Sequence, residues 1–424
     1  MVSSKKDDQP LKLYNSLAGK KQLFAPLAEG HVKIFTCGPS IYDRPHLGNY
    51  RTFLYEDVLH RYLEYLGYEV ERLINFTDVE DKSIVSSAKK MAKLQATTEE
   101  SADKFFQNCG LLHIKVPDFI PRSSTSIDQA VRLIKKLMDK GYAYRLGNDY
   151  FYDPLKFSGF GKLYGLDMNR WPKRKIRYRK DTYEGNRWNR GDFILWHGYR
   201  RERDGDIYWE TELGKGRPAW NIQDPAMITK HLGYRIDIAC GGVDNLYRHH
   251  DYNIAVIEGV SGQKFANFWL HGEHVLLNGK KMSKSKGDIL YPKDLLGKEI
   301  SAVDIRYLLI CGHYRQKLDL TDKMLAEKEK QCRRLRELAG KFIRPLFGAG
   351  TATPESEKTI AMLTRDFNQA MNDDLDVERA SHSLLSNLQR LERHRERNDL
   401  DEAQGDRIRK ELLRFDRVLQ VLFE

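Results

Sequence analysis

Apolar residues recur at helical spacing between residues 54 and 66. The stripe consists of Leu54, Val58, Leu59, Tyr62, Leu63 and Leu66. It predicts an amphipathic helix, and Gly67 has the position of a helix-ending glycine. Short apolar runs at 32–37 and 70–76 lie on either side of this helix and predict buried strands. The order strand, helix, strand is typical of one half of a doubly wound parallel sheet.

The remaining chain divides by its periodicity. Residues 77–145 are mostly helical in pattern, whereas residues 150–215 are rich in Tyr, Trp, Gly, Lys and Arg and predict short strands and loops. A second half of the sheet is expected from Trp220 to about Leu277, with strands at 235–239 and 268–270.

From Leu318 onward the pattern predicts helices only. A seam with alternating spacings of four and three is typical of a helical bundle, and it consists of Ile408, Leu412, Phe415, Leu419 and Leu422. The clearest internal linker is 348–354, which is rich in Gly, Thr and Pro.

Composition restricts the class of protein. The chain has 424 residues, 41% of them hydrophobic, and no apolar run approaches the length of a membrane span. Five scattered cysteines without a CxxC pair argue against a disulfide framework and favour the cytoplasm. The formal charge of +11 favours a polyanionic partner such as nucleic acid, although many cytoplasmic proteins are basic without one.

The segment Pro45-His46-Leu47-Gly48-Asn49 opens the first predicted helix. A helix N-terminus presents free N–H groups and positive potential, which suit a phosphate. Gly48 would let a nucleotide approach the backbone, and His46 could donate to a phosphate oxygen. Taken alone, the segment is equally compatible with a structural turn histidine.

A second segment, Lys281-Met282-Ser283-Lys284-Ser285, lies in a polar region between two glycines. Two lysines on a mobile loop can close over a triphosphate and stabilise the leaving pyrophosphate. Solvated lysine runs are common, but the pairing with His46 favours the catalytic interpretation. Upstream, Gly241 and Gly242 followed by Asp244 could form a turn that holds a ribose, although such a turn is a weak signal alone.

These two segments resemble the two signatures of class I aminoacyl-tRNA synthetases. Further blocks resemble the cysteinyl-tRNA synthetase family in the family's order, namely 35–43, 75–82, 191–196, 216–222 and 312–315. The resemblance implies a Rossmann-type α/β catalytic domain with a C-terminal α-helical bundle, and an ATP- and Mg²⁺-dependent ligase that forms an aminoacyl-adenylate and charges tRNA. The expected segments are a disordered tail (1–10), a first Rossmann half (11–145), a connecting insertion (146–215), a second half with the lysine loop (216–290), a stem-contact region (291–347) and a helical bundle without a separate anticodon domain (348–424).

The resemblance also assigns residues. It implies catalysis by His46, Asn49, Lys281 and Lys284. ATP would be bound by Gly38, His46, Gly48, Asn49, Gly241, Gly242, Asp244, Lys281, Met282, Ser283 and Lys284. The amino acid would be bound by Cys37, Thr77, Trp220, Asp224, His249 and Asn253.

The expected zinc site differs from the family pattern. Members of the family hold zinc with two cysteines, a histidine and a glutamate, and here these positions carry Cys37, Asp224, His249 and Asn253. Cys37, Asp224 and His249 are all acceptable zinc ligands, and a catalytic-type site needs only three. Alternatively the metal is lost, and the Asp224 carboxylate selects a cationic or hydroxyl-bearing amino acid.

The acceptor is also left open. Because no anticodon domain is expected, the domain organisation resembles that of a tRNA-independent relative, the mycothiol ligase. That enzyme transfers an amino acid to a small amine. A basic run from Lys173 to Lys180, interleaved with Trp171 and Tyr178, instead favours nucleic acid. A catalytically silent RNA- or nucleotide-binding paralogue is a third alternative. The oligomeric state is not predicted.

Overall fold

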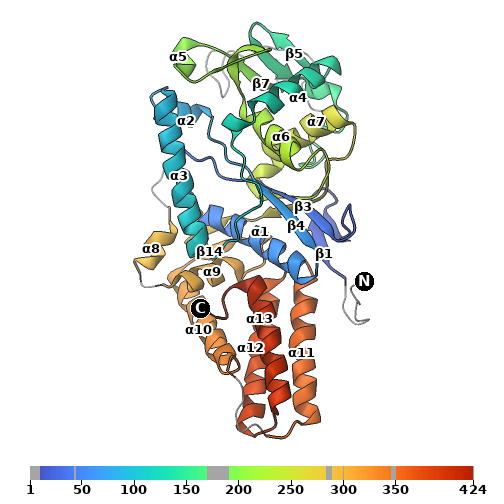
Figure 1. Cartoon of the computed structure of the whole chain (residues 1–424), viewed down its shortest axis with the longest axis vertical. Helices are drawn as coiled ribbons and strands as arrows, with labels where there is room; N and C mark the ends of the chain where they lie inside the picture. Colours follow the sequence, from blue (N-terminus) through green and yellow to red (C-terminus); the bar gives the residue numbers. More distant parts are fainter. Residues whose placement is uncertain are drawn as a thin grey trace.

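The computed structural model describes residues 10–42, 44–169, 191–282, 289–298, 300–344 and 350–423. The molecule is elongated (Figure 1). A central parallel sheet lies between a mixed strand-and-helix region at one end and a bundle of long helices at the other. No helix among the described residues combines the length and apolar character that a membrane crossing requires.

The central sheet has four parallel strands in the order β11-β10-β3-β4. Their bounds are β3 His31–Thr36, β4 Glu69–Ile74, β10 Ile236–Gly242 and β11 Ala266–Gly272. In β10, Ile238 lies opposite Ile34 on β3 and Phe268 on β11. Strands of this kind are covered by helices on both faces, which explains the continuous apolar runs in the sequence.

Helix α1 (Leu47–Tyr65) connects β3 to β4 and buries the predicted stripe, except for Leu66, which follows the helix and is half-buried. Gly67, at φ 94°, follows its end, in agreement with the sequence prediction. The predicted strand–helix–strand unit is therefore confirmed. An N-terminal hairpin, β1 (Lys12–Asn15) with β2 (Lys20–Leu23), packs beside β11.

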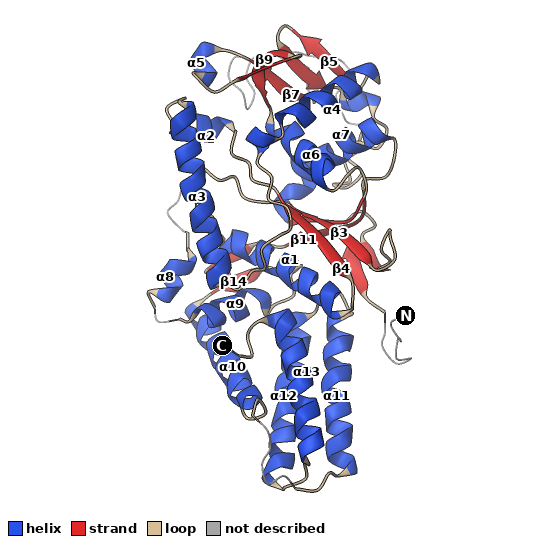
Figure 2. Ribbon diagram, in the orientation of Figure 1, coloured by secondary structure: helices blue, strands red, loops and turns tan. Residues whose placement is uncertain are grey.

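The region between β4 and β10 contains helices and a second sheet (Figure 2). Its helices are α2 Asp81–Ser86, α3 Met91–Leu111, α4 Ile127–Asp139, α5 Arg201–Asp204 and α6 Trp220–His231. The antiparallel sheet has the order β5-β6-β7-β9-β8, with bounds β5 Ala143–Leu146, β6 Asp149–Tyr152, β7 Phe193–Gly198, β8 Trp209–Thr211 and β9 Gly214–Pro218. The short strands predicted for residues 150–215 are present in the described part of this region.

Helix α7 (Asp251–Ser261) connects β10 to β11 and follows a 3₁₀ turn, η3 (Val243–Asn245), and a kinked segment, η4 (Leu246–His250). The lower part contains β12 Val275–Leu277, β13 Lys280–Lys281, β14 Leu318–Leu320, α8 Pro292–Leu296, α9 Ala302–Ile310, α10 Asp322–Gly340, α11 Pro354–Met371, α12 Val377–Glu396 and α13 Glu402–Leu419.

The prediction that only helices follow Leu318 was wrong at its first residues. Residues Leu318–Leu320 form strand β14, which pairs in parallel with β12. Leu318 and Leu320 are both buried while Asp319 between them is less so, which is the two-residue alternation of a half-buried strand. A strand of three residues is too short to be recognised in the sequence next to the helical pattern that follows it.

A buried ion pair connects helix α1 to helix α9. Asp57 on α1 accepts from Arg306 Nη2 on α9 at 2.7 Å, and the same guanidinium donates through Nε to the Leu419 carbonyl of α13 at 2.6 Å. Both charged side chains are almost fully buried. The helix that carries the first signature segment is therefore fixed to two helices of the C-terminal half.

Candidate active site

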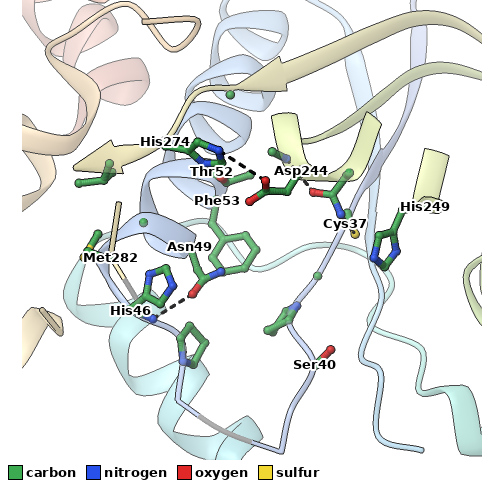
Figure 3. Close-up of a pocket in the computed structure, with 18 of the residues that line it drawn as sticks. Cys37, Ser40, His46, Asn49, Thr52, Phe53, Asp244, His249, His274 and Met282 are labelled. Carbon is green, nitrogen blue, oxygen red and sulfur yellow. Dashed lines mark hydrogen bonds and ion pairs between the residues drawn. The ribbon is translucent and has the colours of Figure 1, made fainter. Parts of the chain in front are cut away.

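A cavity of about 400 Å³ opens at the carboxyl end of the central sheet. It is lined by residues that directly follow β3, β4, β10 and β11, and by the start of α1. Ligands of doubly wound sheets bind at this edge. Figure 3 shows His46 and Asn49 on one side of the cavity and Cys37 with His249 on the other.

The first signature segment forms the N-terminus of α1. Asn49 Oδ1 accepts from the His46 backbone N–H at 3.0 Å, which caps the helix start. A Cβ on Gly48 would lie 2.9 Å from His46 Cε1, so the glycine makes room for the imidazole ring. Residues of α1's first turn thus place a histidine beside a helix N-terminus that favours anions.

The predicted ribose turn and the first loop lysine face each other. Lys281 Nζ lies 3.1 and 3.0 Å from the two carboxylate oxygens of Asp244. His274 Nε2 is 3.4 Å from the same carboxylate and 3.3 Å from Lys281 Nζ. These three side chains line the same cavity as the start of α1.

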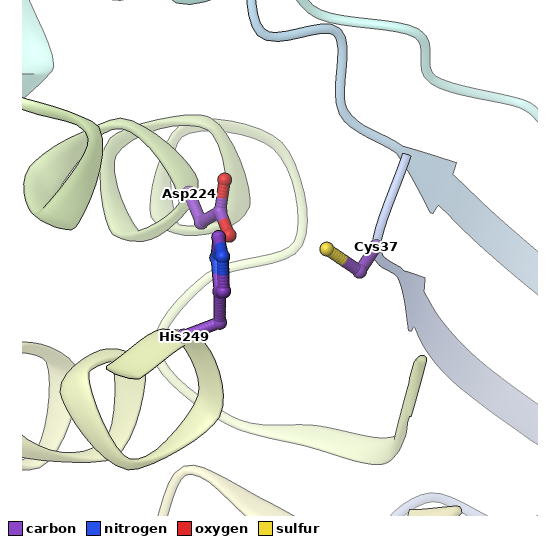
Figure 4. Close-up of side chains that lie close together, drawn as sticks. All are labelled: Cys37, Asp224 and His249. Carbon is purple, nitrogen blue, oxygen red and sulfur yellow. The ribbon is translucent and has the colours of Figure 1, made fainter. Parts of the chain in front are cut away.

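Three predicted metal ligands converge from separate elements (Figure 4). Cys37 follows β3, Asp224 lies on α6, and His249 lies in η4, yet their ligand atoms are within 4.8 Å of one another. The backbone before His249 is unusual, because Arg248 has φ 67° and breaks the helical path. A thiolate, a carboxylate and an imidazole form a donor set that suits zinc.

Burial dominates the electrostatics of this group. It raises the pKa of the Cys37 thiol well above its usual range, and the Asp224 charge raises it further. It also raises the pKa of Asp224 to about 7, against a smaller lowering by the hydrogen bond of Asn253. The pKa of His249 falls to about 4. A neutral imidazole offers a lone pair, and a cation between the three would favour the anionic forms of the other two.

The predicted residues fall into three groups. Those that line the cavity are Cys37, Gly38, His46, Gly48, Asn49, Thr77, Asp224, Gly242, Asp244, His249, Lys281 and Met282. Gly241, Trp220 and Asn253 lie behind that lining: Trp220 packs against the His249 ring at 4.7 Å between centroids, and Asn253 contacts Asp224. Ser283 and Lys284 lie outside the described residues, as does the basic run from Lys173 to Lys180.

The sequence analysis did not single out two asparagines and a histidine that line the same cavity. Asn75 Nδ2 donates to Asp224 Oδ1 at 2.8 Å, and Asn245 Nδ2 donates to Cys37 Sγ at 3.3 Å. His274 joins the contact between Asp244 and Lys281. Asn75 lies within a block that resembles the family, whereas Asn245 and His274 carry no signal in a single sequence.

Comparison with known proteins decides the family. Residues 23–330 match the model of the tRNA synthetases class I (C) catalytic domain. The chain belongs to the cysteinyl-tRNA synthetase family of class I.

Curated members of this family match over nearly the whole chain. The cysteine–tRNA ligase of Chlamydia pneumoniae is 37% identical over 414 residues, which cover 97% of this chain and 86% of the relative. That of Protochlamydia amoebophila is 33% identical over 419 residues, with coverage of 97% and 86%.

Solved structures show the same fold in more distant synthetases. The methionyl-tRNA synthetase of Mycobacterium tuberculosis bound by methionyl-adenylate superposes with a TM-score of 0.65 at 13% identity, covering 92% of both chains. The LeuRS of Agrobacterium radiobacter K84, in a ternary complex with tRNA, gives 0.64 at 12% identity, covering 94% of this chain and 85% of that one. The Rossmann-type fold with a helical C-terminal region is thereby confirmed.

Proposed function

We propose that this family member joins an amino acid to ATP and passes the acyl group to the 3′ end of a tRNA. In the first step a carboxylate oxygen of the amino acid attacks the α-phosphorus and pyrophosphate leaves. In the second step a ribose hydroxyl of the tRNA attacks the acyl carbon and AMP leaves. The observation that carries the proposal is the single cavity that joins the start of α1, the Asp244 turn and a polar pocket at Cys37.

The residue roles follow from position. His46 and Asn49 stand at the helix N-terminus, where they would stabilise charge that develops at the α-phosphate. Gly242 would let the nucleotide approach the backbone, since an added Cβ there would meet no atom closer than 3.6 Å. We place Gly38, Gly48 and Gly241 in the ATP site as well, where the missing side chains make room for neighbouring protein atoms. Asp244 would hold the ribose. The loop residues Lys281, Met282, Ser283 and Lys284 would close over the phosphates.

The pocket at the other end of the cavity would hold the amino acid. Thr77, Trp220 and Asn253 would shape it, with Trp220 packed behind His249. We propose that Cys37, Asp224 and His249 hold Zn²⁺ there, since their donor types and mutual distances suit it. When bound, the ion would supply a Lewis-acidic contact for the amino acid's side chain. Mg²⁺ would accompany ATP.

Amino-acid-dependent exchange of pyrophosphate into ATP tests the first step. Because the relatives are cysteine–tRNA ligases, cysteine is the first substrate to measure. Serine comes next, because Asp224 stands where the family has cysteine. We expect exchange with cysteine or serine, and acylation of total tRNA with the same amino acid. Absence of exchange with all twenty amino acids would refute the proposal.

The second step needs its own measurement. Robust exchange without acylation of any tRNA would instead support the ligase that uses a small amine, which no present observation favours. The free state of all five cysteines agrees with a location in the cytoplasm, which we also propose.

A further inference from the structure

Two asparagines bridge the nucleotide side of the cavity to the amino-acid side. Asn245 Oδ1 accepts from the backbone N–H of Gly242 at 2.9 Å, and its Nδ2 donates to Cys37 Sγ at 3.3 Å. Asn75 repeats the arrangement: its Oδ1 accepts from the Gly38 N–H at 2.8 Å, and its Nδ2 donates to Asp224 Oδ1 at 2.8 Å. Each carboxamide thus joins one glycine to one ligand atom of the pocket.

The glycine contacts fix the orientation of both carboxamides. A backbone N–H can only donate, so the oxygen of each side chain must face its glycine. The two N–H groups of each amide nitrogen then face the pocket, where they meet a sulfur and a carboxylate oxygen. A flipped amide would place N–H against N–H at the glycine and oxygen against oxygen or sulfur in the pocket, which costs two hydrogen bonds.

The bridge made by Asn245 lies in a turn that also carries a nucleotide-side contact. Asp244, the preceding residue of η3, holds Lys281 through both carboxylate oxygens. Consecutive side chains of one turn therefore face opposite ends of the cavity. The glycines make this possible, because a Cβ on Gly241 would lie 3.1 Å from Asn245 Oδ1 and 2.8 Å from His250 Cε1.

We infer that Asn245 is a positioning residue that fixes the Cys37 sulfur relative to the glycine turn, with Asn75 fixing Asp224 relative to Gly38 in the same way. The inference rests on the proposed function, because it assigns the sulfur to the amino acid and the turn to ATP. Asn245 lines the cavity, and its side-chain hydrogen bonds to Cys37 and Gly242 connect it to the two proposed substrate sites. Its hydrogen bond to Gly242 would affect the binding of ATP, and its hydrogen bond to Cys37 would affect the binding of the amino acid. A substitution can remove one bond and keep the other.

Asn245→Asp is the decisive variant. The aspartate keeps an oxygen for the Gly242 N–H but has no N–H for Cys37 Sγ. We expect the dissociation constant for ATP, measured by calorimetry, to stay within about twofold of the unmodified chain. The KM for cysteine in pyrophosphate exchange should rise about tenfold or more, the size of one hydrogen bond to a charged group. Asn245→Ala, which loses both bonds, should weaken ATP and cysteine alike.

Asn387→Ala is the matched control. Asn387 is a buried asparagine on α12 that donates to Asp366 at 3.1 Å, far from the cavity in the fold. It should leave both constants unchanged, which separates a positioning effect from general destabilisation. Equal effects of Asn245→Asp and Asn245→Ala on ATP, or an unchanged KM for cysteine in Asn245→Asp, would overturn the inference.

A spectroscopic measurement separates failure of the inference from failure of the proposed function. Protein loaded with Co²⁺ should show sulfur-to-cobalt charge-transfer absorption from Cys37, and this band should shift in both Asn245 variants but not in Asn387→Ala. A band shift without any exchange activity would refute only the proposed function. An unshifted band would refute the role of Asn245, and a chain that neither takes up Co²⁺ nor supports exchange would refute both.

Discussion

Lys281 and Asp244 neutralise each other at the wall of the cavity, with Lys281 Nζ 3.0 Å from the nearer carboxylate oxygen. The side chains are 55% and 66% exposed, so the pair contributes little to folding. ATP would have to displace this contact, because we propose that Asp244 holds the ribose and that Lys281 contacts the phosphates. The pair therefore connects the two predicted ATP contacts before the nucleotide arrives.

Asp244→Asn should accordingly affect nucleotide binding and not stability. We expect the KM for ATP in pyrophosphate exchange to rise about tenfold, because one charged hydrogen-bond acceptor is lost. The midpoint of thermal unfolding should remain unchanged. Asp206→Asn is the control, because it breaks another exposed pair, with Lys90 at 3.1 Å, far from the cavity. A similar KM in both variants would contradict the role of Asp244.

His46→Ala should slow activation without unfolding the chain. The imidazole stands at the N-terminus of α1, where it would stabilise charge at the α-phosphate, and loss of one such group costs about 10²–10³ in kcat. Single-turnover adenylate formation measures this step directly. His31→Ala, at an exposed histidine paired with Glu69, should keep the rate. A wild-type rate in His46→Ala would show that the histidine has only a structural role.

Gly38→Ala tests the close approach of two chain segments beneath the cavity. A Cβ at position 38 would lie 1.8 Å from the Asn75 carbonyl oxygen, which is backbone and cannot simply rotate away. We expect a loss of about 1–3 kcal/mol in the free energy of unfolding, measured in urea, together with loss of exchange. Gly110→Ala on α3 meets no atom within 4 Å and should stabilise the chain by up to about 1 kcal/mol.

The proposed zinc site predicts a metal content that depends on three side chains. Purified protein should hold about one equivalent of zinc by elemental analysis. Cys37→Ala, Asp224→Ala and His249→Ala should each lose most of it, and Asp224→Cys should bind it more tightly, because thiolate is the softer ligand. Trp220→Phe, which keeps a ring behind His249, should retain the metal. Full zinc occupancy in His249→Ala would place the ion elsewhere.

The sequence predicted the sheet and helix α1 well, because both have strong apolar periodicity. The convergence of Cys37, Asp224 and His249 came from the family resemblance, since Cys37 precedes the other two by 187 and 212 positions and such separations carry no local signal of contact. The strand Leu318–Leu320 was missed, because its pairing with β12 depends on tertiary contacts. The roles of Asn245 and Asn75 could not be predicted either, because the hydrogen-bond partners of a side-chain amide depend on which groups surround it in the folded chain.

The buried pair of Asp57 and Arg306 predicts acid sensitivity. Burial alone would raise the pKa of Asp57, but Arg306, Arg61 and other partners lower it to about 2. A carboxyl whose folded pKa lies below its unfolded value stabilises the fold above about pH 4, and this stabilisation is lost as the pH falls toward 2. The shift corresponds to about 2 kcal/mol in the free energy of unfolding.

Urea unfolding at a series of pH values between about 6 and 2.5 measures this loss. Asp57→Asn should remove that part of the pH dependence, but it also leaves the Arg306 charge without its buried partner and should cost about 3–5 kcal/mol at neutral pH. Arg61→Gln is the milder variant, because Arg61 Nε contacts the same carboxylate at 2.8 Å and is partly exposed. It should raise the pKa of Asp57 and move the acid-induced loss to higher pH. An unchanged pH profile in Arg61→Gln would mean that the remaining partners, Arg306, Arg72 and the Lys115 backbone N–H, are enough to keep this carboxyl charged under acid.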